Sequence, residues 1–374
     1  LTYINGLKSV EKAKEKFMAL FQYADKNQII KDFDNFVSSL KDANIELEDI
    51  FNLDISGSFD KLSIIEAELE LLQKCEFACK YCVINGSPNG DPGLDVKSWS
   101  KIVKWLINNN LRACTITGGD PMLSEAFWPV LELLVEKDIA ITINTTGAKI
   151  DKDFIEKISK FKNKNNISFQ ISLDSTEREV NDYYRGVGAF DTSLKAIKIL
   201  RSCGFNVVIS CIIFKEPKKR MDEMINFASK YGCKVRFGEL DYVGRAQKLL
   251  KKEDVSLSQE DKAELNEYLM DLKFTKPEMF NDRITIDSKD ESEMYIQDGK
   301  RKCPLAFGTI DIYFDGTIKP CSLPKDYFES IDRDYVSLNA LDEPDLANSN
   351  MYKKISNIQV DPNKNNSSCI LGQL

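Results

Sequence analysis

The first regular alternation of hydrophobic and polar side chains runs through residues 63–72. Ala67, Leu69 and Leu71 occupy every second position there, and glutamates fill the positions between them. Alternation with a period of two is typical of a β-strand that is buried on one face. We therefore predict a strand that leads directly into the loop beginning at Cys75.

Beyond this loop, short apolar segments of strand length alternate with segments of helical periodicity. The predicted strands are 113–117, 139–144, 167–173, 206–214 and 234–238. The predicted helices are 99–106, 124–137, 153–161, 192–202 and 220–231. With the first strand this makes six strands alternating with helices, which specifies an α/β fold with a parallel sheet, either open or curled as a barrel. Parallel barrels bind ligands at the carboxyl ends of their strands, so the informative residues should lie there.

Segments of different character flank this row of elements. Residues 28–44 have helical periodicity within a charged N-terminal region, and residues 255–272 predict another helix after the last strand. Further on, two alternating runs enclose Asp315 and Gly316, a dipeptide typical of a β-hairpin turn. The predicted domains are an N-terminal element at 1–55, the α/β domain at 56–285 and an α+β domain at 286–374.

Composition narrows the possible functions. The 374 residues include 59 acidic and 51 basic side chains, a balance that argues weakly against a nucleic-acid partner. No apolar run is long enough to span a membrane and no signal-like segment begins the chain, so we expect the ten cysteines in a reducing cytoplasm. The chain contains no histidine, so proton transfer must use Asp, Glu, Tyr, Lys or Cys. Leu1 at the start, and a last cysteine five residues from the end, suggest that both termini have been trimmed.

Cys75, Cys79 and Cys82 follow the first strand and are separated by three and then two residues. Three thiolates can ligate three irons of a 4Fe-4S cluster and leave the fourth iron open to a ligand that is not protein. A structural zinc site usually has four protein ligands, and no second cysteine pair lies nearby. The spacing therefore favours a cluster, with zinc as the alternative.

With the aromatic Tyr81 before its last cysteine, this motif resembles that of the radical SAM superfamily. The resemblance implies that Cys75, Cys79 and Cys82 ligate the cluster and that Tyr81 lies near the adenine of S-adenosylmethionine (SAM). In that superfamily SAM chelates the open iron, and an electron from the cluster cleaves SAM to a 5′-deoxyadenosyl radical. The resemblance also implies that the sheet is a partial (β/α)6 barrel.

A motif after the second strand fits the same resemblance. Gly118, Gly119, Asp120 and Pro121 are similar to the superfamily's Gly-Gly-Glu segment, which binds the methionine amino group. Paired glycines allow a close approach of backbone to a ligand, although an ordinary glycine turn is the alternative. Asp120 takes the place of the more frequent glutamate and would accept a hydrogen bond from the ammonium group.

Three more side chains are candidates for SAM binding by this resemblance. Ser172 and Arg185 belong to a stretch similar to the superfamily's "SLD…D…RG" sequence, and we expect them at the ribose and the carboxylate, with a surface charge as the alternative for the arginine. Asn144, at the end of the third strand, is a further candidate of the same kind. After the sixth strand, residues 244–246 match the Gly-Arg-Ala sequence that closes the barrel in the SPASM branch.

The hairpin cysteines indicate a second cluster. Twelve residues separate Cys303 from Gly316 and four separate Gly316 from Cys321, a spacing similar to that of SPASM and Twitch domains, which bind auxiliary iron–sulfur clusters. Downstream only Cys369 remains, so the resemblance implies one auxiliary cluster held by Cys303, Cys321 and Cys369. Its fourth ligand could be a carboxylate, a substrate thiolate or a cysteine missing from a trimmed end. Two buried hairpin cysteines without a cluster are the alternative.

Two other features bear on the reaction. Residues 1–50 loosely resemble the helical half of the winged-helix element that binds leader peptides in peptide-maturing enzymes, but the strands of that element are missing. Ser322 stands where sulfatase-maturing relatives carry an aspartate base, which disfavours formylglycine chemistry. Glu239 and Asp241 are the nearest carboxylates for proton transfer, and we predict Glu239 as the catalytic one, with a solvated rim charge as the alternative.

Together these features predict a cytoplasmic radical SAM maturase of SPASM or Twitch type that modifies a ribosomally made precursor peptide with a leader segment. It would abstract a hydrogen atom and form a thioether or carbon-based crosslink, as in sactipeptides and ranthipeptides, with flavodoxin or ferredoxin as electron donor and no membrane partner. A thioether is preferred, because a three-cysteine cluster suits a thiol substrate. The alternatives are a Twitch-type dehydrogenase of a small molecule and a non-enzymatic iron–sulfur or zinc scaffold.

Overall fold

The computed structural model describes most of the chain between residues 64 and 357. The described residues are 14, 30–31, 33–34, 37–38, 64–240, 243–253, 255–275, 284–286, 296–297, 300–301, 308–321 and 325–357. The chain divides into two compact units, residues 1–61 with 270–277 and residues 62–269 with 278–374. Cys303 and Cys369 lie outside the described residues, as does nearly all of the predicted N-terminal element.

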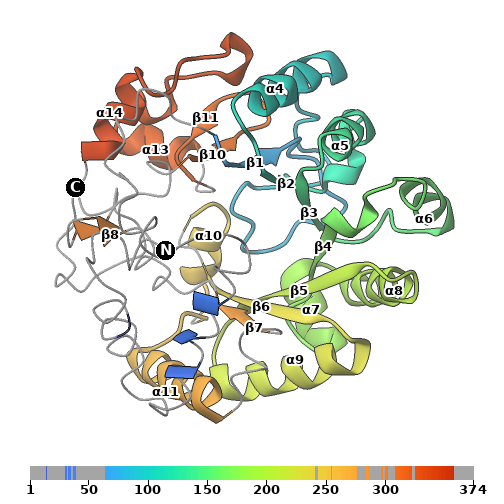
Figure 1. Cartoon of the computed structure of the whole chain (residues 1–374). Coiled ribbons are helices and arrows are strands. Elements are labelled where there is room, and N and C mark those ends of the chain that lie inside the picture. The colour runs from blue at the N-terminus through green and yellow to red at the C-terminus, as the bar shows by residue number, and fades with distance from the viewer. Residues whose placement is uncertain are drawn as a thin grey trace. The chain divides into compact units, whose positions relative to one another are not determined.

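A nine-stranded sheet forms the centre of the second unit, and its strands follow one another along a curved surface (Figure 1). The strands, in spatial order, are Ile318–Lys319 (β11), Thr309–Ile312 (β10), Glu66–Glu70 (β1), Ala113–Thr117 (β2), Ala140–Thr145 (β3), Ile167–Ser172 (β4), Asn206–Ile213 (β5), Lys234–Glu239 (β6) and Ile284–Ile286 (β7). All neighbouring pairs are parallel except β10 and β11. The six predicted strands are all present in consecutive order, which confirms the predicted α/β fold class. A separate antiparallel pair joins Ile296–Gln297 (β8) to Lys300–Arg301 (β9).

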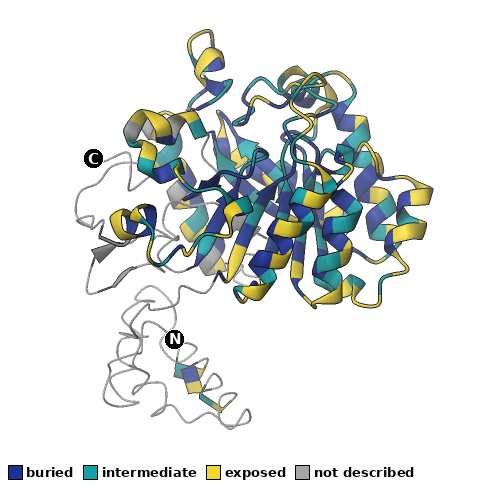
Figure 2. Cartoon of the chain, turned by 90° about the horizontal axis from the view of Figure 1, so that it is seen from above, coloured by how far each residue is buried: buried dark blue, intermediate teal, exposed yellow. Residues whose placement is uncertain are grey.

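The helices are Val96–Asn108 (α4), Phe127–Glu136 (α5), Lys152–Ile158 (α6), Arg178–Arg185 (α7), Ala189–Ser202 (α8), Pro217–Tyr231 (α9), Ala246–Leu250 (α10), Gln259–Thr275 (α11), Lys325–Ile331 (α13) and Asn350–Asn357 (α14). Helices α4, α5, α6, α8 and α9 lie on the outer side of the sheet (Figure 1). Alternate strand residues, such as Ala67, Leu69 and Ile116, have no exposed surface. Figure 2 shows the same pattern, with exposed residues concentrated on the outward faces of the helices. The predicted alternation therefore produces a sheet that is buried beneath these helices.

Local sequence explains where the first helices of the row begin. Asp95 caps α4 by accepting a hydrogen bond of 2.7 Å from the N–H of Ser98. The helix predicted to start at Ser124 starts instead at Phe127, because Pro121–Leu123 forms a separate 3-10 turn before it. Helices α7 and α10 were not predicted, because each is short and α7 consists mostly of polar residues.

The C-terminal hairpin joins the same sheet. Strand β10 pairs in parallel with β1, so that Ala67 lies opposite Ile310, and β11 adds an antiparallel strand at the edge. Asp315 and Gly316 form the predicted turn, in which Asp315 Oδ1 accepts a hydrogen bond of 2.9 Å from the N–H of Thr317. The boundary predicted at residue 286 therefore falls within a continuous sheet, since strands on both sides of it pair with the α/β domain.

Candidate active site

Backbone hydrogen bonds close the cysteine loop that follows β1. The N–H of Cys75 donates to the carbonyl of Ser87 at 2.9 Å, and the N–H of Ser87 donates to the carbonyl of Gln73 at 3.3 Å. Cys75 is buried, whereas Cys79 and Cys82 are partly exposed. The structure therefore holds the three predicted ligands in one loop at the carboxyl end of β1.

The thiols of this loop differ in environment. The N–H of Gly86 donates to Sγ of Cys82 at 3.2 Å. Burial raises the pKa of Cys75 to about 12, and burial also raises the pKa of Cys79, although two nearby guanidinium groups oppose it. Burial therefore favours the neutral thiols, and ligation to iron is what would hold them as thiolates.

A polar cavity of about 220 Å³ adjoins the loop. Its lining comes from residues 83–85 on one side and from Tyr313, Lys325, Asp326 and Glu329 on the other. The segment after Cys82, the C-terminal hairpin and α13 thus all contribute to the lining of one cavity. Within the described part of the chain, no three cysteine or carboxylate side chains converge on a site for a single metal ion.

The Gly-Gly-Asp segment after β2 packs against the chain that leads into Cys75. The N–H of Gly119 donates to the carbonyl of Leu72 at 2.7 Å, and the N–H of Asp120 donates to that of Lys74 at 2.9 Å. A Cβ atom at Gly119 would lie 2.1 Å from the carbonyl oxygen of Lys74. Glycine is therefore required here by close packing of this segment against the cysteine loop.

Asp120 has no exposed surface, and both of its carboxylate oxygens accept hydrogen bonds. Oδ1 accepts from the N–H of Met122 at 3.1 Å, in the turn that begins at Pro121. Oδ2 accepts from the hydroxyl of Thr145 at 2.8 Å and from the N–H and hydroxyl of Thr146 at 2.9 and 2.6 Å. Asp120 thus fastens the end of β3 to the segment after β2. Its predicted contact with the SAM ammonium group would add to these bonds, and it stays a prediction.

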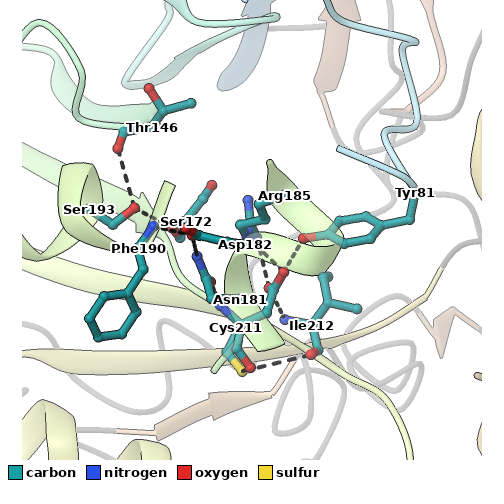
Figure 3. A network of polar contacts seen from close by, with 11 residues as sticks. Tyr81, Thr146, Ser172, Asn181, Asp182, Arg185, Phe190, Ser193, Cys211 and Ile212 are labelled. Carbon is teal, nitrogen blue, oxygen red and sulfur yellow. Dashed lines mark hydrogen bonds and ion pairs between the residues drawn. The ribbon is translucent and has the colours of Figure 1, made fainter. Parts of the chain in front are cut away.

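Asp174, which follows the end of β4, is buried and makes several polar contacts. Its partners Tyr81, Asn181, Arg185 and Ile212 are labelled in Figure 3. Its carboxylate accepts a hydrogen bond from the hydroxyl of Tyr81. It also pairs with Arg185, whose Nη2 lies 2.8 Å from Oδ1 and whose Nε lies 2.7 Å from Oδ2. The N–H of Ile212 donates to Oδ1 at 3.0 Å, and the N–H of Asp174 donates to Oδ1 of Asn181 at 3.0 Å. One carboxylate therefore connects the cysteine loop, α7 and β5.

The predicted SAM-binding residues Tyr81 and Arg185 both contact Asp174. Burial alone would lower the pKa of Arg185, but the charge and hydrogen bond of Asp174, together with Tyr81 and Cys79, raise it. Burial also raises the pKa of Tyr81, so both side chains keep their protons near neutral pH. Arg185 is buried, which excludes the alternative of a surface charge. Direct contact of these two residues with SAM stays a prediction.

Ser172 and Asn144 lie near the carboxyl ends of β4 and β3. The carbonyl of Ser172 accepts a hydrogen bond of 2.8 Å from the hydroxyl of Ser193 on α8 (Figure 3). The Oδ1 atom of Asn144 is buried and has no hydrogen-bond partner among the described residues. A buried acceptor of this kind is unfavourable until a ligand or water supplies a donor, which agrees with a ligand-binding role for Asn144.

The remaining predicted site residues lie further along the chain. Glu239 ends β6, and its Oε2 lies 3.5 Å from Nζ of Lys262 on α11. Its catalytic role stays a prediction. Cys321 follows β11 and is partly exposed, while Cys303 and Cys369 lie outside the described residues. The auxiliary cluster therefore also stays a prediction.

Three side chains that organise this site had been given no role by the sequence analysis. Asp174 and Arg245 lie within motifs noted there, and their place in those motifs was a usable signal. Spacing along the chain, however, cannot show which partner a side chain meets. Thr146, which donates two hydrogen bonds to Asp120, carried no signal at all.

Comparison with known proteins identifies the domain that contains the cysteine loop. The sequence profile of the radical SAM superfamily matches residues 69–228. The chain carries a radical SAM domain. Radical SAM domains use a 4Fe-4S cluster and SAM, which are the cofactors that the cysteine motif predicted.

Curated relatives of this chain include proteins named for peptide maturation. Mycofactocin maturase MftC from Mycobacterium tuberculosis is 30% identical over 178 residues, which cover 47% of this chain and 44% of MftC. The antilisterial bacteriocin subtilosin biosynthesis protein AlbA from Bacillus subtilis is 26% identical over 275 residues, which cover 73% of this chain and 58% of AlbA. The chain spans about half the length of the curated relatives it matches.

Solved structures share the fold. Streptococcus suis SuiB bound to S-adenosylmethionine aligns with a TM-score of 0.62 at 19% identity, covering 94% of this chain and 79% of SuiB. The enzyme anSMEcpe with bound AdoMet and Cp18Cys peptide aligns with a TM-score of 0.58 at 18% identity, covering 79% of this chain and 82% of that protein. These likenesses confirm the predicted partial barrel.

The described residues fit the radical SAM cofactors. Three thiols share one loop, and a backbone N–H already donates to one of them. Besides Asn144, the carboxylate of Glu76 in the cysteine motif has both oxygens buried without a hydrogen-bond partner among the described residues. Burial raises the pKa of Glu76. Polar groups are thus left unsatisfied in the cysteine motif and near the carboxyl end of β3, and a polar ligand such as SAM would supply partners for them.

Proposed function

We propose that this protein is a radical SAM maturase that modifies a ribosomally made peptide. The observation that carries the proposal is the position of the cysteine loop, which lies at the carboxyl ends of the parallel strands within the radical SAM domain. The peptide substrate is inferred from relatives named as maturation and bacteriocin biosynthesis proteins. The solved structure of SuiB bound to the precursor peptide SuiA supports the same class of substrate.

In this proposal Cys75, Cys79 and Cys82 hold the 4Fe-4S cluster. The cluster and SAM, when bound, supply a 5′-deoxyadenosyl radical that abstracts a hydrogen atom from the peptide. The chain's own residues build the site around them. Asp174 fixes the positions of Tyr81 and Arg185, so that the cysteine loop keeps one orientation relative to β4 and β5.

Other parts of the chain have proposed roles in the same reaction. Residues 286–374 would form a SPASM- or Twitch-like region whose auxiliary cluster is held by Cys303, Cys321 and Cys369. The pairing of β10 with β1 supports this, because it attaches the hairpin that ends in Cys321 to the strand that leads into the cysteine loop. Residues 1–55 would bind the leader segment, and 56–285 would form the barrel.

The chemistry and cellular setting complete the proposal. A thioether crosslink fits an auxiliary cluster that has three cysteine ligands and room for a substrate thiolate. Glu239, at the end of β6, is the candidate for proton transfer. The electron would come from a flavodoxin or ferredoxin in the cytoplasm. In the described part of the chain, every helix is too short or too polar to cross a membrane.

Cleavage of SAM tests the first step. After anaerobic reconstitution with iron and sulfide, reduction with dithionite in the presence of SAM should produce 5′-deoxyadenosine, measured by liquid chromatography and mass spectrometry. A variant with Cys75, Cys79 and Cys82 replaced by alanine should produce none. Failure of the wild-type protein, or zinc as its bound metal, would refute the proposal.

Coexpression with a short cysteine-containing peptide encoded beside this gene tests the second step. A thioether product should have lost two hydrogen atoms relative to the precursor, and fragmentation should locate the new bond. The same peptide with its cysteines replaced by serine should stay unmodified. Deletion of residues 1–50 should weaken peptide binding and turnover without abolishing SAM cleavage. If 5′-deoxyadenosine formation responds only to a small molecule, the dehydrogenase alternative is favoured.

A further inference from the structure

The two residues after β6 that begin the Gly-Arg-Ala sequence reach back to the cysteine loop. Gly244 has a φ of +58°, and a Cβ atom there would lie 2.3 Å from the carbonyl oxygen of Val83. The same Cβ atom would lie 2.5 Å from the carbonyl oxygen of Cys82. Both the backbone conformation and the close approach therefore require glycine. Because Gly244 has no side chain, the backbone comes close enough for Arg245 to contact the loop directly.

Arg245 holds that loop at three carbonyl groups. Its Nε donates to the carbonyl of Cys79 and its Nη2 to that of Gly86, each at 2.7 Å. Its backbone N–H donates to the carbonyl of Cys82 at 3.1 Å. A planar guanidinium group presents several donors in a fixed geometry, so one side chain can fasten two distant points of a loop at once. The loop residues lie about 160 positions earlier in the sequence.

The bond to Gly86 also affects a predicted cluster ligand. The N–H of this same glycine donates to Sγ of Cys82 at 3.2 Å. By holding the carbonyl of Gly86, Arg245 limits rotation of the residue whose N–H is directed at the sulfur. The guanidinium also places a permanent positive charge beside the loop, since its nitrogens lie 2.7 Å from the carbonyl oxygens of Cys79 and Gly86.

We propose that Arg245 is a positioning residue for the iron–sulfur cluster, which fixes the cysteine loop and stabilises the reduced cluster through its charge and the Gly86 to Cys82 hydrogen bond. This inference rests on the proposed function, because it takes the cysteine loop as the cluster site. Proteins set the reduction potential of an iron–sulfur cluster through hydrogen bonds to its sulfur atoms and through charged groups nearby. Loss of a positive charge and of an N–H donor both disfavour the added electron, so both shift the midpoint potential in the negative direction.

Two substitutions separate the contact from the charge. In R245Q the charge is lost and the two-point contact with the loop is broken. In R245K the charge remains, but an ammonium group cannot reproduce the fork geometry. Each variant is reconstituted, iron release to a chelator is timed, and the cluster is titrated by electron paramagnetic resonance at controlled potentials. Neither measurement needs the peptide substrate.

We expect both variants to release iron about tenfold faster than the wild type. R245Q should in addition have the most negative midpoint potential. R245K should lie between R245Q and the wild type, because it keeps the charge but loses the hold on Gly86. Equal iron release in all three proteins would overturn the positioning role. A midpoint potential of R245Q equal to that of the wild type would overturn the electrostatic role.

The control residue is Arg201, whose guanidinium group also donates to two backbone carbonyl groups, but at helices α8 and α9 instead of the cysteine loop. Its Nη1 donates to the carbonyl of Phe205 at 2.7 Å and its Nε to that of Tyr231 at 3.4 Å, between α8 and α9. R201Q should lower thermal stability without changing iron release or potential at a temperature where it is folded. If R201Q and R245Q show the same iron release and the same midpoint potential, the effect of R245Q is general destabilisation and the inference fails. If the wild-type protein assembles no cluster, the proposed function itself fails.

Discussion

The ammonium group of Lys319 on β11 lies 2.5 Å from Oε1 of Glu70 on β1, and both side chains are almost fully buried. The two residues are 249 positions apart in the sequence, so this ion pair fastens the C-terminal hairpin to the strand that leads into the cysteine loop. Glu68 and Asp311 lie opposite each other on the same face of β1 and β10. Three carboxylates therefore share the ammonium group of Lys319 within the sheet.

Removing the two partners of this pair should have unequal effects. K319M removes the cation that Glu70, Glu68 and Asp311 share, and we expect it to lower the free energy of unfolding by about 3–5 kcal/mol. E70Q leaves Lys319 close to Asp311, so it should cost less, about 1–3 kcal/mol. The double variant E70L/K319M should recover most of the loss. Urea unfolding measures all three, and a larger loss for E70Q than for K319M would contradict this account.

Glu68 should make stability depend on pH. Burial and the adjacent Glu70 raise the pKa of Glu68 in the folded protein from 4.5 to about 7. Between these values the folded state binds the proton more tightly than the unfolded chain, so the free energy of unfolding falls as pH rises from about 4.5 to 7. E68Q removes this dependence. Relative to E68Q, the wild type should lose about 1–3 kcal/mol across that range.

Urea unfolding of both proteins at intervals from pH 5 to pH 8 checks this prediction. Glu70 and Asp311 contribute dependence of the same sign, because burial raises their pKa values as well. The free energy of unfolding of E68Q should therefore still fall with rising pH, but less steeply than that of the wild type. Parallel profiles would show that Glu68 titrates alike in the folded and unfolded chains.

The buried contacts of Asp174 should contribute more to the free energy of unfolding than an exposed ion pair between an arginine and an aspartate does. D174N leaves the buried guanidinium of Arg185 without a charged partner and should lower the free energy of unfolding by about 3 kcal/mol. Y81F removes one hydrogen-bond donor and should cost about 1 kcal/mol. The control is R178Q, which breaks the exposed pair with Asp191 and should change stability by less than about 0.5 kcal/mol.

Chemical unfolding of the protein without cofactors provides these values. SAM cleavage by the reconstituted variants then separates stability from function. D174N should also reduce formation of 5′-deoxyadenosine at a temperature where it stays folded, because it releases the cysteine loop from β4. Equal losses for D174N and R178Q would argue against a special role for the buried contacts of Asp174.

Asp120 should be needed for folding whether or not it contacts SAM. D120A removes the acceptor for four donors, from Met122, Thr145 and Thr146, and should lower the free energy of unfolding by about 2–4 kcal/mol. T146V removes one of these donors and should cost about 1 kcal/mol. Calorimetry gives the stabilities, and equilibrium dialysis gives SAM affinity. If T146V weakens SAM binding as much as D120A does, Asp120 acts mainly by holding the end of β3.

Close packing at Gly119 should make it intolerant of a methyl group. In G119A the new Cβ atom would meet the carbonyl oxygen of Lys74 at 2.1 Å and displace the chain that leads into Cys75. We expect loss of most of the iron taken up on reconstitution. G204A is the control, because Gly204 has a φ of +81° but open space around its Cα, so only backbone strain of about 1 kcal/mol arises. Similar iron contents in the two variants would contradict the packing argument.

Periodicity was sufficient to predict the barrel strands. The segments 113–117 and 167–173 match β2 and β4 to within one residue, because buried strands of a parallel sheet have a strong apolar pattern. The start of α5 was misplaced, because Pro121–Leu123 forms a turn whose hydrogen bonds are not visible in periodicity. Strand β7 was not predicted, because three residues are too few to establish a pattern.

Motif spacing placed the candidate site but could not supply its contacts. Cys75, Cys79 and Cys82 were found by spacing alone, since a cluster needs ligands on one short loop. The predicted residues Tyr81 and Arg185 both proved to be held by Asp174. Which carboxylate would hold them depends on how the ends of β4 and β5 approach the loop, and this is a property of the folded sheet.

The sequence by itself determined the order of strands and helices, the cysteine loop and the strand ends at which polar residues gather, because each depends on neighbours a few positions apart. Only the tertiary structure decided that the hairpin pairs with β1, that Lys319 meets Glu70 and that Arg245 holds the loop of Cys79 and Cys82. These contacts join segments about 160 to 250 residues apart. They form only when burial of apolar surface brings the strands together, so no local pattern records them.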